Sequence, residues 1–103
     1  MNYKIQYIGE IEDFENDNSD VFVEFEDGRK YVATFFTLSN IMRIMNRYKE
    51  SGECSNGKYF WSSDMIIVEN LNPLILRESI DDLIKNEEFE TVFSKIDSDV
   101  EEC

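Results

Sequence analysis

The chain has 103 residues, of which 23 are Asp or Glu and 10 are Lys or Arg, so its net charge is −13 at pH 7. Hydrophobic residues make up 42% of it, which suffices for one domain with a modest core and excludes a disordered acidic chain. The negative charge argues against nucleic acid and anionic membranes as direct partners, because both carry like charge.

The N-terminal quarter combines a predicted strand with a run of acids. The strand lies within residues 2–12, where Tyr3, Ile5 and Tyr7 would share one face. A polar loop follows at residues 13–20. From Ile5 to Gly28 the chain holds nine acids and no Lys or Arg. Clustered like charges do not favour folding, so this run indicates either a solvated loop or a surface that attracts a basic partner.

A β-hairpin is predicted from residues 21–26 and 29–37, because the Asp27-Gly28 dipeptide between them is typical of two-residue turns. Such a turn would place Val23 opposite Val32. The face predicted to be core carries Val21, Val23, Phe25, Val32 and Phe36. The face predicted to meet solvent or a partner carries Phe22, Glu24, Tyr31, Ala33 and Phe35.

The middle of the chain predicts a helix followed by a strand. Thr37 or Ser39 can cap a helix that runs to about Ser51 and stops at Gly52. A turn at residues 52–57 leads into a strand over residues 58–69. The second half of this strand is apolar on both faces, which indicates a central position in the sheet.

Two more helices are predicted in the last third. Asn72-Pro73 is a cap followed by proline at the first helical position, so a helix should run to about Lys85. Its buried stripe would consist of Leu76, Ile80, Leu83 and Ile84. A last short helix is predicted over residues 87–96.

The element order β-β-β-α-β-α-α predicts an α+β domain with a mainly antiparallel sheet of about four strands and helices packed on one face. We expect residues 1–96 to form this single domain and residues 97–103 to be an acidic, poorly ordered tail. No run resembles a signal peptide or a membrane span, so the expected location is the cytoplasm.

The sequence lacks the residues that most catalytic and metal sites need. It contains no histidine, which removes the usual general base, the Ser-His and Cys-His pairs and most zinc sites. Its four glycines are scattered and form no phosphate-binding motif. Cys54 and Cys103 are expected to be free thiols. We therefore expect a binding protein rather than an enzyme, with no catalytic residue, no metal and no cofactor.

The candidate binding residues are acids that would steer a basic partner and aromatic side chains that would be desolvated against it. The predicted steering acids, most of them on a loop expected to be mobile, are Glu10, Glu12, Asp13, Glu15, Asp17, Asp20 and Glu24. The predicted anchors are Phe14, Tyr31, Phe35 and Trp61.

Three segments resemble one family of small acidic bacterial proteins that are encoded beside secreted or contact-delivered toxins. The segments are DGRKYVATFFTLSNI (27–41), GECSNGKYFWSSDMIIVENL (52–71) and IDDLIKNEEFETVF (80–93). The chain is thereby similar, over about residues 20–95, to immunity proteins of contact-dependent growth inhibition and related polymorphic toxin systems. The stretch YFWSSDMIIVE is the most specific element. The resemblance carries over no catalytic motif.

The resemblance implies a protein that binds a toxin domain in the cytoplasm and inhibits it stoichiometrically. A nuclease toxin, acting on RNA or DNA, would present a basic groove that an acidic surface complements. Two alternatives remain at this point. One is a regulatory or scaffold module for a basic cellular protein. The other is a nucleic-acid mimic, although the concentration of basic residues after Gly28 argues against it.

Overall fold

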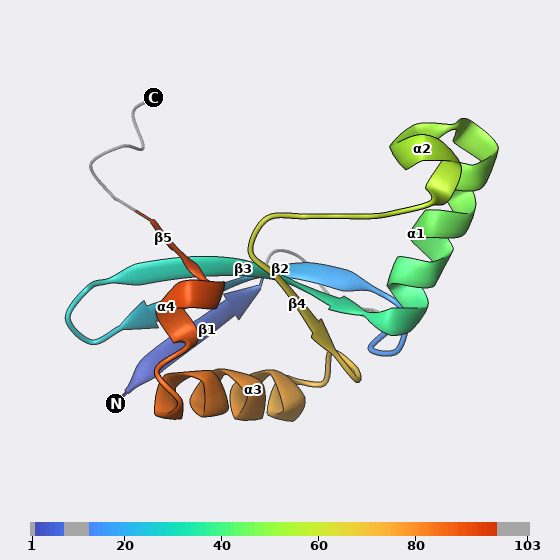
Figure 1. The fold of residues 1–103 in the computed structure, drawn as a ribbon. Coiled ribbons are helices and arrows are strands. Elements are labelled where there is room, and N and C mark those ends of the chain that lie inside the picture. Colours follow the sequence, from blue (N-terminus) through green and yellow to red (C-terminus); the bar gives the residue numbers. More distant parts are fainter. Residues whose placement is uncertain (1, 8–12, 97–103) are drawn as a thin grey trace.

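The computed structural model describes residues 2–7 and 13–96 and shows an α+β fold, as predicted (Figure 1). The predicted tail, residues 97–103, lies outside the described residues. The elements, in chain order, are β1 (Tyr3–Tyr7), β2 (Asn18–Phe25), β3 (Lys30–Thr37), α1 (Leu38–Ser51), α2 (Glu53–Gly57), β4 (Met65–Val68), α3 (Pro73–Lys85), α4 (Phe89–Val92) and β5 (Ser94–Ile96).

The five-stranded sheet is mostly antiparallel, in the order β1-β2-β3-β4, with β5 also paired to β3. Strand β4 runs parallel to β3 at Thr34–Thr37, and β5 runs antiparallel to it at Lys30–Val32. Among the described strands, β4 pairs only with β3, so it is an edge strand whose Ile67 is 48% exposed. The prediction of a central position for this segment was wrong.

The β2–β3 hairpin has a three-residue loop instead of the predicted two-residue turn. The Phe25 N–H donates to the Arg29 carbonyl at 2.9 Å, and the Gly28 N–H donates to the Phe25 carbonyl at 3.0 Å. Gly28 has a φ of +93°, as the bulge position of such a loop requires. The register is therefore shifted by one residue, with Val23 opposite Tyr31.

This shift exchanges the two faces of β3, because side chains alternate along a strand. Tyr31 and Phe35 point inward and are 2% and 0% exposed, while Val32 points outward and is only half-buried. The prediction that placed Tyr31, Ala33 and Phe35 on the partner-facing side was wrong.

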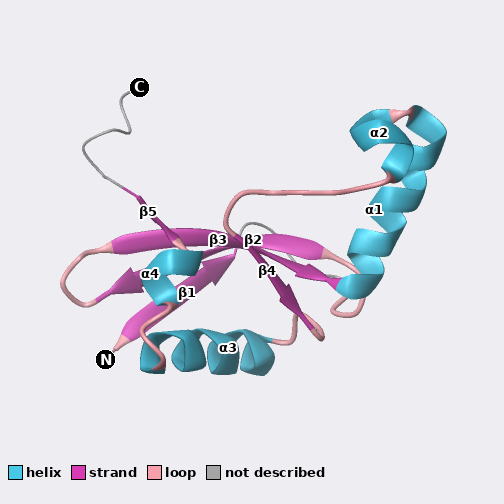
Figure 2. Ribbon diagram, viewed as in Figure 1, coloured by secondary structure: helices cyan, strands magenta, loops and turns pink. Residues whose placement is uncertain are grey.

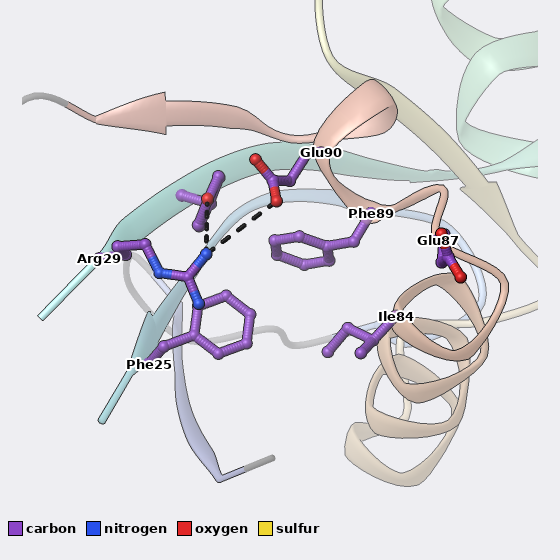
Figure 3. A pocket seen from close by; sticks show the side chains of 7 residues that line it. Phe25, Arg29, Ile84, Glu87, Phe89 and Glu90 are labelled. Atoms are coloured by element: carbon purple, nitrogen blue, oxygen red, sulfur yellow. Dashed lines mark hydrogen bonds and ion pairs between the residues drawn. The ribbon is translucent and has the colours of Figure 1, made fainter. Parts of the chain in front are cut away.

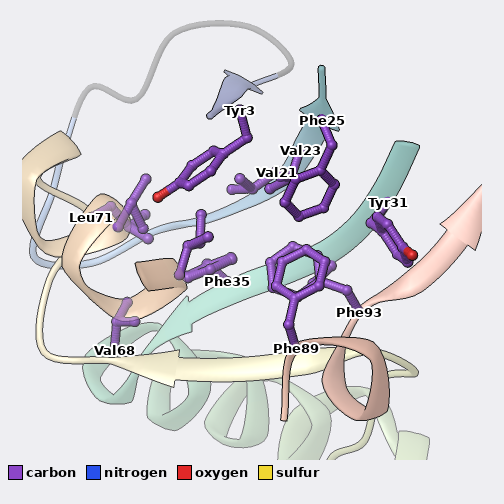
Figure 4. Packing of buried hydrophobic residues seen from close by; sticks show 13 residues of the cluster. Tyr3, Val21, Val23, Phe25, Tyr31, Phe35, Val68, Leu71, Phe89 and Phe93 are labelled. Atoms are coloured by element: carbon purple, nitrogen blue, oxygen red, sulfur yellow. The ribbon is translucent and has the colours of Figure 1, made fainter. Parts of the chain in front are cut away.

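The main core lies between one face of the sheet and the helices α3 and α4, which pack on that face (Figures 1 and 4). Its aromatic centre is Phe89, which stacks on Phe93 with ring centroids 4.3 Å apart and meets Phe25 and Tyr31 edge to face. The other buried members are Tyr3, Val21, Val23, Ala33, Phe35, Val68, Leu71, Leu76 and Ile80.

The C-terminal segment departs from the single helix predicted over residues 87–96. It forms the one-turn helix α4 and then turns extended at Phe93, so that Ser94–Ile96 can pair with β3. A helix this short gains little from its own hydrogen bonds. The ladder with β3 is available only in the extended form, and it decides the outcome.

Helix α1 begins and ends where its caps predict. The Thr37 hydroxyl accepts the Asn40 N–H at 3.2 Å, and Gly52 ends the helix with a φ of +91°. Beyond the sheet, α1 and α2 form an arm that stands apart from the main core (Figure 1). Phe60 secures the chain that returns from this arm, because its ring packs edge to face on Phe36, with centroids 5.2 Å apart.

Tyr3 links β1 to α3 and gives the fold a testable pH dependence. Its hydroxyl donates to Asp81, and the Arg77 guanidinium lies 4.4 Å from its ring centroid. Burial, followed by this hydrogen bond, raises the pKa of Tyr3 to about 12. The neutral phenol is thus favoured in the folded state, so its contribution to stability is fully present below pH 10, the pKa of an unperturbed tyrosine.

That contribution is lost as the pH rises from about 10 to about 12. We expect Tyr3→Phe to make the fall in stability across this range less steep, because phenylalanine has no proton to lose. Urea denaturation at a series of pH values measures the slope. Tyr59→Phe is the control, since Tyr59 is 51% exposed. Equal slopes for Tyr3→Phe and the unmodified protein would contradict the assignment.

Candidate partner-binding surfaces

The acidic segment, residues 13–20, whose last three residues already belong to β2, is tied to the body of the protein at several points. The Leu71 N–H donates to the Phe14 carbonyl at 2.8 Å, and the Thr37 N–H donates to the Asp17 carbonyl at 3.3 Å. Within the loop, an Asp13 carboxylate oxygen accepts the Glu15 N–H at 3.0 Å. Residues 13–20 thus present their charges from a hydrogen-bonded backbone, and their mobility stays a prediction.

The structure separates the predicted steering acids into three groups. Asp13, Glu15 and Asp20 are exposed, while Asp17 is half-buried. Glu24 lies on the outer face of the sheet, directly opposite Lys4 in β1 and Lys30 in β3. Cross-strand neighbours of opposite charge partly neutralise a carboxylate, so Glu24 is poorly placed to steer a partner. Glu10 and Glu12 lie outside the described residues.

Two of the four predicted anchors are accessible. Trp61 is 68% exposed and Phe14 is 38% exposed. Tyr31 and Phe35 are core residues, since the shifted hairpin register turns them inward. Tyr59, which is not among the predicted anchors, is 51% exposed two residues before Trp61. Both belong to the irregular segment 58–64 between α2 and β4 (Figure 2), of which the predicted strand over 58–69 retains only Met65–Val68.

A pocket that the sequence did not indicate opens between the hairpin end and the α3–α4 junction (Figure 3). We call it the Arg29 pocket; its volume is about 340 Å³, and its lining residues are Phe25, Arg29, Tyr31, Ile84, Glu87, Phe89 and Glu90. These residues come from two segments far apart in the sequence, 25–31 and 84–90, so no local pattern could have revealed it.

Arg29 forms one wall of this pocket. Its guanidinium lies 5.0 Å from the centroid of the Phe25 ring, and its Nε donates to Asp27 at 2.8 Å. Its Nη1 lies 4.0 Å from a Glu90 carboxylate oxygen. Asp27 also accepts the Arg29 backbone N–H at 3.1 Å, and this bond is the main cause that lowers the pKa of Asp27. Asp27 and Glu90 thus offset the positive charge of Arg29.

Glu87 stands at the opposite side of the pocket in an unusual backbone conformation. The Glu88 N–H donates to the Leu83 carbonyl at 2.9 Å and the Glu87 N–H to the Ile84 carbonyl at 3.1 Å. This pair of bonds is the Schellman arrangement that ends many helices, and Glu87 has the left-handed φ of +59° that it requires. Glycine normally fills that position, because a side chain there is strained.

Replacement of Glu87 by glycine is expected to raise the free energy of unfolding by about 0.5–1 kcal/mol, since relief of strain exceeds the added freedom of the unfolded chain. Urea denaturation measures the change. Glu88→Gly removes the same charge one residue later, where φ is an ordinary −107°, and should lower stability. A loss of stability in both variants would show that Glu87 carries no strain.

Within the part of the chain that the structure describes, no group of three or more Cys, Asp or Glu residues is placed to hold a metal ion. The described helices include none with the length and apolar character to cross a membrane. Comparison of the chain with protein families, with curated proteins and with solved structures finds no match.

Proposed function

We propose that this chain is an immunity protein that acts in the cytoplasm, where it binds and neutralises a cognate toxin domain by stoichiometric protein–protein inhibition. The resemblance of residues 20–95 to such proteins supplies the role. The excess of acids, 23 against 10 basic residues, supplies the expected chemistry of the partner. A nuclease domain fits best, because its substrate groove is basic and an acidic protein would both approach it rapidly and compete with its substrate.

The exposure of Trp61 and Tyr59 is the observation that carries this proposal. A single exposed aromatic residue is ordinary on a monomer, but here two occur in the seven-residue segment 58–64. Phe60, between them, packs on Phe36 and lies near Tyr48, with ring centroids 5.2 and 6.5 Å apart. The segment is thereby held in place and presents its two outer aromatics to solvent. Preorganised aromatic residues are typical anchors of tight interfaces.

The direct test is co-expression with the toxin encoded by the neighbouring gene. We expect the protein to restore growth of cells that produce the toxin and to co-purify with it in a 1:1 complex. Failure of both rescue and co-purification would overturn the proposal. Rescue without a complex would contradict stoichiometric inhibition.

Trp61→Ala is expected to weaken binding to that toxin by about tenfold or more, because tryptophan anchors typically contribute over 1 kcal/mol to an interface. Isothermal titration calorimetry measures the affinity. Leu74→Ala is the matched control, since Leu74 is 63% exposed but lies on α3. Neither variant should change the unfolding midpoint much. Equal affinities of the two variants for the toxin would show that Trp61 is not part of the interface.

A further inference from the structure

The Arg29 pocket combines an apolar floor with an acidic mouth. The rings of Phe25, Tyr31 and Phe89 form the floor and are at most 5% exposed. Ile84 completes the apolar lining, and Glu87 and Glu90 stand exposed at the mouth (Figure 3). At about 340 Å³ the cavity is at the small end of the range of ligand pockets, roughly 300–1,000 Å³. A single side chain of a partner is an occupant of suitable size.

The charges at the mouth favour a cation. Asp27 is the close partner of Arg29, at 2.8 Å, whereas Glu90 lies 4.0 Å from it and can face a second cation as well. Glu87, by contrast, makes no ion pair within residues 2–7 and 13–96. Two further acids, Glu26 and Glu88, are exposed on the adjoining hairpin loop and helix junction. An anion would meet this excess of carboxylates, whereas a cation is attracted both by them and by the net charge of the whole chain.

The shape of the remaining space distinguishes between the two long cationic side chains. The face of Phe25 is covered by the Arg29 guanidinium, 5.0 Å from the ring centroid, and one face of Phe89 is covered by Phe93. A second guanidinium would therefore lack its preferred stacking surface. A lysine needs only an apolar wall for its stem and carboxylates near its compact ammonium group. Ile84 and Phe89 provide the wall, and Glu87 and Glu90 provide the carboxylates.

We propose that the Arg29 pocket receives a lysine side chain of the toxin, with its stem against Ile84 and Phe89 and its ammonium group at Glu87 and Glu90. The proposal rests on the proposed function for the identity of the partner. It accounts for the strained backbone of Glu87, because glycine would suit the helix end but would remove a carboxylate from the mouth. The pocket thus adds an anchoring site to the exposed aromatics of segment 58–64.

The test titrates the full chain with a capped Gly-Lys-Gly peptide at physiological salt. Two-dimensional NMR monitors the binding. We expect saturable shifts of the backbone amides of Phe25, Ile84 and Phe89. The same peptide with norleucine, or with an acetylated lysine, should bind at least about fivefold more weakly, since each lacks the positive charge. Shifts that centre on residues 13–20, or equal binding of the three peptides, would overturn the proposal.

Three variants distinguish binding in the pocket from general electrostatic attraction. Glu87→Gln with Glu90→Gln should weaken lysine-peptide binding about fivefold. The control, Asp13→Asn with Glu15→Gln, changes the net charge equally and should have less effect. Ile84→Phe keeps the charge and should abolish binding by filling the pocket, with a retained NMR spectrum as proof of folding. Undiminished binding in the first or the third variant would overturn the proposal.

This experiment needs no toxin, so its outcome is distinct from that of the growth assay. Peptide binding without rescue would leave the pocket intact as a lysine site and reject the immunity function. Rescue without peptide binding would support the function and reject the pocket as its anchoring site.

Discussion

Phe35→Ala is expected to lower the free energy of unfolding by about 3–5 kcal/mol, the usual loss for a phenylalanine removed from a packed core. Phe35, in β3, is 0% exposed, and its ring meets Phe93 with centroids 6.0 Å apart. Alanine would leave a cavity between the sheet and the segment after α4. Since a domain of this size is stabilised by roughly 5–15 kcal/mol in total, the variant should be close to unfolding at 37 °C.

Urea denaturation followed by circular dichroism measures this loss. Phe22→Ala is the matched control, because Phe22 lies on the outer face of β2 and is only half-buried; its loss should be about 1 kcal/mol. Similar small losses at both positions would contradict the register of the hairpin. The comparison also decides between an anchor and a core residue, because removal of an anchor weakens binding without unfolding the protein.

The sequence predicted the elements whose ends are marked by local chemistry. Thr37 and Gly52 delimit α1, and Asn72 with Pro73 begins α3, because caps act through backbone groups only a few residues away. The fold class follows from these elements together with the β-rich runs. Helical spacing also predicted the stripe of α3, of which Leu76 and Ile80 are buried and Leu83 and Ile84 are half-buried.

The hairpin register could not be obtained in the same way. Asp27-Gly28 suits a two-residue turn, but it equally ends a three-residue loop in which Gly28 is the bulge residue. Strand β3 has large apolar residues on both faces, so its pattern does not identify the inner one. The choice is made by packing, which places Tyr31 against Phe89, with ring centroids 5.0 Å apart. This packing buries Tyr31 and Phe35, the two predicted anchors that proved to be core residues.

The Arg29 pocket is even harder to predict from a sequence pattern than the hairpin register. It exists because the extended segment Ser94–Ile96 pairs with the start of β3 and so brings α4 against the hairpin end. The predicted helix over residues 87–96 would not have formed this contact. Charges that seemed dispersed in the chain, at residues 26–27 and 87–90, become neighbours only through that pairing.

Gly57→Ala is expected to lower stability by about 2–4 kcal/mol, because strain and steric overlap act together there. Gly57 has a φ of +75°, which disfavours any side chain. An alanine Cβ would also overlap the Met45 carbonyl oxygen and would lie 2.6 Å from Lys49 Cγ and 2.9 Å from the Lys49 nitrogen. Two of these three atoms belong to the backbone of α1 and cannot move aside without disturbing the helix.

Gly28→Ala separates the two causes, since Gly28 has a similar φ of +93° but an alanine Cβ there would meet no surrounding atom within 4 Å. Its loss should be about 1 kcal/mol, the strain alone. Urea denaturation gives both values, and hydrogen exchange should show that Gly57→Ala weakens protection mainly in α1. Equal losses of stability in the two variants would mean that a shift between α1 and α2 relieves the steric overlap at residue 57 with no loss of stability.

The same pair of variants connects the arm to binding. Tyr59 and Trp61 closely follow Gly57, and their direction depends on how α2 returns the chain from α1. If these aromatics are anchors, Gly57→Ala should reduce affinity for the toxin even under conditions in which the protein remains folded. Gly28→Ala, at the far end of the sheet from the arm, should leave the contribution of these anchors unchanged. If the aromatic segment binds because it is preorganised, Gly57→Ala should therefore weaken binding although residue 57 does not itself contact the toxin.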